Sequence, residues 1–99
     1  MNHDIDFLRF LKEKPSLLGI DSFHDLHKFL SGFQIAILIM NDVHVQEVIR
    51  DEVCIKRGLH ISNRPWYFAV YENNGEDLQR TLLDVSDILR EFFRLINER

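Results

Sequence analysis

"FQIAILIM", residues 33–40, is the stretch of sequence on which the predicted fold class depends. All of its residues except Gln34 are apolar, and the run lies between Gly32 on one side and Asn41 and Asp42 on the other. A short apolar run between turn-forming residues is typical of a β-strand that is covered on both faces. We therefore predict a strand here, either in the centre of a sheet or at an edge that a second copy of the chain buries.

The following segment, residues 42–57, fits two interpretations. In the first, Asn41 and Asp42 form a two-residue hairpin turn between strands. Residues with β-branched side chains, which favour strands, are frequent in this segment: Val43, Val45, Val48, Ile49, Val53 and Ile55. In the second, Asn41 or Asp42 caps a helix that ends at Gly58. The β-branched residues make strands the preferred interpretation, and the helix is the alternative.

The aromatic segment "WYFAVYE", residues 66–72, is predicted to be a further strand that a turn at residues 73–75 closes. Side chains alternate between the two faces of a strand. One face is wholly apolar and is therefore the expected core face, with Trp66, Phe68 and Val70. The other face carries two tyrosines around a small residue, with Tyr67, Ala69 and Tyr71. Tyrosine combines apolar area with a hydroxyl that tolerates water, so Tyr67 and Tyr71 are the candidates for a contact surface. The alternative is that both tyrosines cover the second face of the sheet beneath the first two helices.

Three helices are predicted outside these segments. Residues 4–14 have helical apolar spacing, and Pro15 closes the segment. A second helix starts after a cap at Asp21 or Ser22 and stops at Gly32. Residues 76–98 have the most regular pattern, in which apolar residues recur at alternating steps of four and three: Leu78, Leu82, Val85, Leu89, Phe92 and Ile96.

These elements predict an α+β fold in one domain, residues 1–99. Two N-terminal helices precede a small, mostly antiparallel sheet, and the long C-terminal helix packs on one face of that sheet. The alternative is an α/β fold, in which residues 42–57 form a crossover helix and strands 33–40 and 66–72 run parallel.

Charge and composition exclude several classes of function. The 99 residues carry a net charge of −4, and basic residues do not cluster as nucleic-acid binding requires. The longest uninterrupted apolar run, residues 35–40, is far too short to span a membrane. Cys54 is the only cysteine, so the chain has no internal disulfide. We therefore expect a cytoplasmic protein that binds neither nucleic acid nor membranes.

Residues with catalytic or metal-binding chemistry do not form a recognisable motif. His24 and His27 lie three residues apart with Asp21 and Asp25 nearby, but a zinc site requires three or four ligands. Cys54 lies between Val53 and Ile55, where burial makes a thiol unreactive. We therefore predict no catalytic residue, no metal site and no cofactor. A small enzyme that uses His44 or His60 with a nearby carboxylate is an alternative.

The remaining interpretation is a protein that binds another protein. Acidic residues outnumber basic ones in residues 72–87, and such a surface favours a partner with a basic face. The predicted partner-binding residues come from the aromatic segment and this acidic segment: Arg64, Tyr67, Tyr71, Glu72, Asp77, Asp84 and Asp87. The most specific form of this prediction is a small acidic inhibitor, an immunity-type protein or antitoxin that neutralises a partner enzyme or toxin. The alternative is a structural subunit that forms a homodimer through the 78–96 stripe or through strand 33–40.

Overall fold

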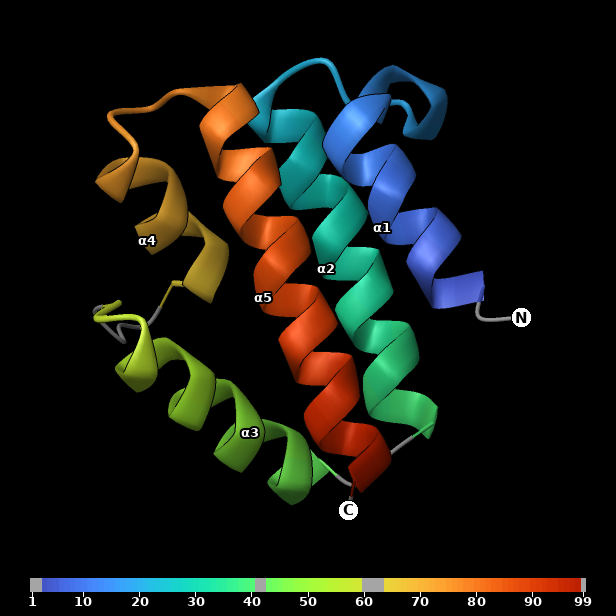
Figure 1. Cartoon of the computed structure of the whole chain (residues 1–99), viewed down its shortest axis with the longest axis vertical. Helices are drawn as coiled ribbons and strands as arrows, with labels where there is room; N and C mark the ends of the chain where they lie inside the picture. The colour runs from blue at the N-terminus through green and yellow to red at the C-terminus, as the bar shows by residue number, and fades with distance from the viewer. Residues whose placement is uncertain (1–2, 41–42, 60–63, 99) are drawn as a thin grey trace.

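The computed structural model describes residues 3–40, 43–59 and 64–98 of the chain, most of which are helical (Figure 1). The elements are α1 (His3–Glu13), a 3-10 helix η1 (Pro15–Leu18), α2 (Phe23–Met40), α3 (Val43–Lys56), α4 (Trp66–Asn73) and α5 (Leu78–Glu98). No β-strand occurs in these three ranges. The predicted α+β fold with its sheet is therefore wrong, and so is the α/β alternative.

The predicted strand over residues 33–40 is instead the second half of α2. A run in which almost every residue is apolar fits a helix as well as a strand, because it shows neither the helical nor the strand spacing of apolar residues. Gly32 was expected to end the preceding helix, but it lies inside α2. A glycine in a helix interior costs only about 0.5–1 kcal/mol relative to alanine, which is too little to stop a helix that its neighbours favour.

The segment after α2 follows the helical alternative. Residues Val43–Lys56 form α3, so the preferred interpretation as strands is wrong. The proposed turn or cap at 41–42 lies outside the described residues. Gly58 ends α3 as the helical interpretation required: its φ is +71°, and the N–H of Leu59 donates to the carbonyl of Cys54 at 2.8 Å. This pattern of backbone bonds around a left-handed glycine is the Schellman motif.

The aromatic segment is also helical. Pro65 stands at the N-cap of α4, and its carbonyl accepts the N–H of Phe68 at 3.1 Å. A second Schellman motif ends α4: Gly75 has a φ of +64°, and the N–H of Glu76 donates to the carbonyl of Tyr71 at 2.9 Å. The predicted turn after this segment is therefore confirmed, but the strand before it is wrong.

Three sequence predictions for the other helices are confirmed. Helix α1 ends just before Pro15. The hydroxyl of Ser22 accepts the N–H of Asp25 at 3.2 Å and so caps α2. Helix α5 coincides with the most regular apolar pattern, and the carboxylate of Asp77 accepts the N–H of Arg80 at 3.1 Å at its N-terminus.

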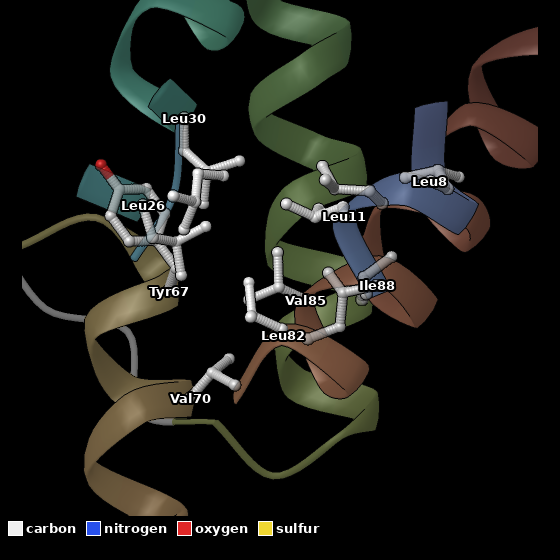
Figure 2. Close-up of a cluster of buried hydrophobic side chains, with 12 residues drawn as sticks. Leu8, Leu11, Leu26, Leu30, Tyr67, Val70, Leu82, Val85 and Ile88 are labelled. Atoms are coloured by element: carbon white, nitrogen blue, oxygen red, sulfur yellow. The ribbon is translucent and has the colours of Figure 1, made fainter. Parts of the chain in front are cut away.

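Helix α5 is the element around which the core is built. It packs closely against α1, α3 and α4, and Figure 1 shows α3 and α4 on the opposite flank of α5 from α1. Figure 2 shows side chains of α1, α2, α4 and α5 converging on one cluster. Its buried members are Leu8, Leu11, Ile20, Leu26, Leu30, Val53, Tyr67, Val70, Leu82, Val85, Ile88 and Leu89. The extents of 33 × 33 × 20 Å correspond to about two layers of helices, since one helix with its side chains is about 10 Å across.

Two small polar residues of α5 are also fully buried. The hydroxyl of Thr81 donates to the carbonyl of Asp77 at 2.7 Å, and the hydroxyl of Ser86 donates to the carbonyl of Leu82 at 2.8 Å. These bonds within the helix satisfy groups that would otherwise be costly to bury. Across the described ranges, no helix has the length and apolar character needed to cross a membrane.

Candidate functional site

Tyr67 lies in the core of the molecule, with an exposed fraction of 0%. Its hydroxyl lies 2.7 Å from Nδ1 of His27 and 3.1 Å from the hydroxyl of Ser31. His27 and Ser31 are four residues apart and therefore face the same side of α2. Tyr67 thus joins α4 to α2, and its predicted place at a contact surface is wrong.

The helical period explains why the predicted core face of this segment is confirmed for Val70 and wrong for Tyr67. In a helix, residues three and four apart share a face, so Tyr67 and Val70 point inward together. Trp66 and Phe68, which the strand interpretation placed in the core, are only half-buried. Tyr71 is also half-buried, so part of its side chain is accessible to solvent.

The group of Tyr67, His27 and Ser31 acts as a structural tie. Burial raises the pKa of the Tyr67 phenol, partly offset by the hydrogen bond from Ser31, so the phenol stays neutral at physiological pH. The tautomer of His27 decides whether the imidazole or the phenol donates in the 2.7 Å bond. Every buried side-chain nitrogen and oxygen in the described part of the chain has a hydrogen-bond partner. The sequence pattern gave no sign of the bond between His27 and Tyr67.

A set of half-buried aromatic rings lies where α2 meets α4, and we call Phe23, His27, Phe68 and Tyr71 the aromatic seam. The rings of Phe23 and Tyr71 are stacked, with centroids 3.9 Å apart and planes at 10°. Phe68 meets Phe23 edge-to-face at 5.0 Å and His27 edge-to-face at 5.1 Å. Both arrangements are favourable for aromatic pairs, so the rings hold one another in place while part of each faces solvent.

Two charged residues of the predicted site flank Phe68. The guanidinium carbon of Arg64 lies 5.3 Å from the centroid of the Phe68 ring, within the range of a cation–π interaction. The same guanidinium forms an ion pair with Glu72, and both side chains are more than half exposed, at 56% and 53%. The structure therefore brings together Arg64, Tyr71 and Glu72, which the sequence placed at one surface.

The three acidic residues predicted on the C-terminal helix have different surroundings. Asp77 caps α5. The carboxylate of Asp84 accepts the side-chain N–H of Asn74 at 2.9 Å, which joins the end of α4 to α5. Asp87 lies one turn further along α5 and is 3.6 Å from Arg90. Residues 64–87 contain five acidic residues and two arginines, so this part of the chain carries a net charge of −3.

Asp25, which was considered for metal binding, forms a hydrogen bond at the start of α2. The carboxylate of Asp25 accepts the N–H of Asp21 at 3.0 Å, and this bond is the main reason why the pKa of Asp25 is lowered. Within the described ranges, no group of three or more His, Cys, Asp or Glu side chains is placed to hold a metal ion.

Other candidate catalytic residues are buried or lie outside the described residues. Cys54 is buried, so the prediction of a buried cysteine is confirmed, and burial raises the pKa of its thiol. The side chain of His44 and the whole of His60 belong to the part of the chain that the structure does not describe.

Comparisons with known proteins add no assignment. No protein-family model matches the chain, and no curated protein or solved structure matches it significantly. The function must therefore be inferred from the residues themselves.

Proposed function

We propose that this protein is a non-enzymatic protein-binding domain that engages its partner through α4 and the first turns of α5. Its most specific form is a cytoplasmic inhibitor of the immunity or antitoxin type, which neutralises a partner enzyme or toxin. The observation that carries the proposal is the half-exposed stack of Tyr71 on Phe23 beside the ion pair of Arg64 and Glu72.

This surface has the properties of an interaction hot spot. Tyrosine and arginine are enriched among the residues that dominate binding energy in protein interfaces. Tyr71 already has a fixed ring position because it is stacked on Phe23, so little side-chain entropy is lost when a partner binds. The net charge of −3 over residues 64–87 favours encounter with a partner that has a basic face.

Self-assembly through the apolar stripe of α5 has less support. Three residues of that stripe are already buried inside the chain by other helices: Leu82, Val85 and Leu89. The second route, pairing of strand 33–40 with its copy, requires a strand where the structure has helix α2. The partner is therefore proposed to be a different protein.

The test is capture of a partner from the native lysate with the tagged protein, its Tyr71→Ala variant and a control variant. The control is Phe10→Ala, because Phe10 is also half-buried and also lies beneath an arginine, but on α1. We expect a stoichiometric partner that is retained by Phe10→Ala, weakened by Tyr71→Ala and released at high salt. A partner retained equally by all three proteins would contradict the proposed surface.

A further inference from the structure

Arg64, Phe68 and Glu72 form a cluster in which one guanidinium contacts both an aromatic ring and a carboxylate. The guanidinium of Arg64 lies over the ring of Phe68 and pairs with the carboxylate of Glu72. Phe68 is held by edge-to-face contacts with Phe23 and His27, so its position does not depend on Arg64. An aromatic ring beside a carboxylate is complementary to a planar guanidinium, which stacks on the ring and donates to the carboxylate.

We propose that the ring of Phe68 and the carboxylate of Glu72 form an acceptor site for an arginine side chain of the partner, and that Arg64 occupies this site in the free protein. This inference rests on the proposed function, because it names the group that the partner inserts. Arg64 then acts as a gate, since the partner's arginine must displace it before binding.

The charges around the site favour this occupant. Residues 64–87 keep a net charge of −3 with Arg64 included, so a second guanidinium is attracted to the surface. The ion pair of Arg64 with Glu72 is more than half exposed, and exposed ion pairs are weak. Arginine fits better than lysine, because only the planar guanidinium can stack on Phe68 and pair with Glu72 at the same time.

Release of Arg64 leaves the rest of the site in place. Arg64 precedes Pro65, the N-cap of α4, so it lies outside the helix. Helix α4 is fixed by Tyr67, whose hydroxyl bonds to His27 and Ser31. Removal of the Arg64 side chain should therefore open the acceptor site without unfolding the helix that carries it.

The experiment is an NMR titration with the peptide acetyl-Gly-Arg-Gly-amide, in which the ring protons of Phe68 and Tyr71 are followed. The same peptide with citrulline in place of arginine is the ligand control, because citrulline keeps the shape and loses the charge. The protein variants are Arg64→Ala, Arg64→Ala with Glu72→Gln, and Arg9→Ala. Arg9→Ala is the matched control, since Arg9 also lies over an aromatic ring, that of Phe10 at 5.8 Å.

We expect Arg64→Ala to bind the arginine peptide about tenfold more tightly than the unmodified protein, which corresponds to the loss of one competing cation–π contact with its ion pair. Addition of Glu72→Gln should abolish most of that gain in affinity. The citrulline peptide should not shift the ring-proton resonances of Phe68. Equal affinity of Arg64→Ala and the unmodified protein, an equal gain in Arg9→Ala, or absence of binding in every variant would each overturn the inference.

The peptide titration and the partner capture can succeed or fail independently of each other. Partner capture that depends on Tyr71, together with a peptide that fails to distinguish Arg64→Ala, would retain the binding surface and reject the gate. Tighter peptide binding by Arg64→Ala without any Tyr71-dependent partner would support the acceptor site and contradict the proposed function.

Discussion

Helices α5 and α4 differ in how far their sequences reveal them. The 21 residues of α5 repeat an apolar spacing of four and three over almost six turns, which separates a helical period from a strand period. The eight residues of α4 begin with six consecutive apolar residues and contain no visible period. Local pattern determines the assignment of α5, whereas contacts with α2 and α5 decide the position of α4.

The largest expected effect comes from a charge placed on the inner face of α5. Leu82 is 2% exposed, so Leu82→Asp buries an unpaired carboxylate and should cost more than about 4 kcal/mol, enough to unfold a small domain. The adjacent Leu83 is 41% exposed, and Leu83→Asp should change stability by less than about 0.5 kcal/mol. Thermal unfolding followed by circular dichroism measures both. Equal effects would contradict the inner and outer faces assigned to α5.

The next effect separates the two tyrosines of α4. Tyr67→Ala removes a buried ring and leaves His27 and Ser31 without their shared partner, so it should cost about 3–5 kcal/mol. Tyr71→Ala removes a half-exposed ring stacked on Phe23 and should cost only about 1 kcal/mol. Urea denaturation of both variants measures the difference. The reverse order would place Tyr71 in the core and contradict the orientation of α4.

A smaller and opposite pair of effects tests where helices end. Gly75 has a φ of +64°, so Gly75→Ala forces a side chain into the left-handed region and should destabilise by about 1–2 kcal/mol. Gly32 lies inside α2, and a Cβ atom built there meets no atom within 4 Å. Gly32→Ala should therefore stabilise by about 0.5–1 kcal/mol. A destabilising Gly32→Ala, measured by the same denaturation, would show that α2 is interrupted at this residue.

The smallest expected effect concerns an ion pair that joins α3 to α5. Glu91 bonds to Lys56 at 2.9 Å and to Arg57 at 3.1 Å, and the bond to Lys56 is the main cause that lowers the pKa of Glu91 below its ordinary value of 4.5. A lowered pKa in the folded state means that this stabilisation is present above pH 4.5 and is lost as the pH falls through the lowered value.

Glu91→Gln should therefore reduce stability at neutral pH by less than about 1 kcal/mol and flatten the loss of stability in acid. Denaturation of both proteins across the acidic range measures this difference. If the free energies of unfolding of the two proteins stay parallel down to the most acidic pH, the Glu91 carboxylate does not contribute to the pH dependence of stability.

The sequence predicted the helices whose boundaries are marked by local chemistry. Three local features marked these helices correctly: Pro15 the end of α1, Ser22 the start of α2, and the apolar repeat the extent of α5. Residues 33–40 and 66–72 were assigned wrongly because an apolar run without gaps has no period, and its β-branched or aromatic residues then favour a strand. Both segments are helical in the structure despite this local preference for a strand.

The candidate site was predicted in part for the same reason. Arg64 and Glu72 were both predicted at the partner-binding surface, and the structure joins them in an ion pair although Arg64 precedes α4 and Glu72 lies near its end. Tyr67 was placed on the wrong side because a strand and a helix assign it opposite directions. Phe23 was not predicted at the site, since its stacking with Tyr71 joins residues far apart in the sequence.

The most direct test of this account is an NMR measurement on α4. The Cα chemical shifts of residues 66–73 report the backbone state, and nuclear Overhauser effects between the Tyr67 and His27 rings report the contact with α2. We predict helical shifts across the segment and a strong ring-to-ring effect, since the two centroids are 5.6 Å apart. Extended-type shifts, with no effect between Tyr67 and His27, would contradict both the helical fold of α4 and the surface built on it.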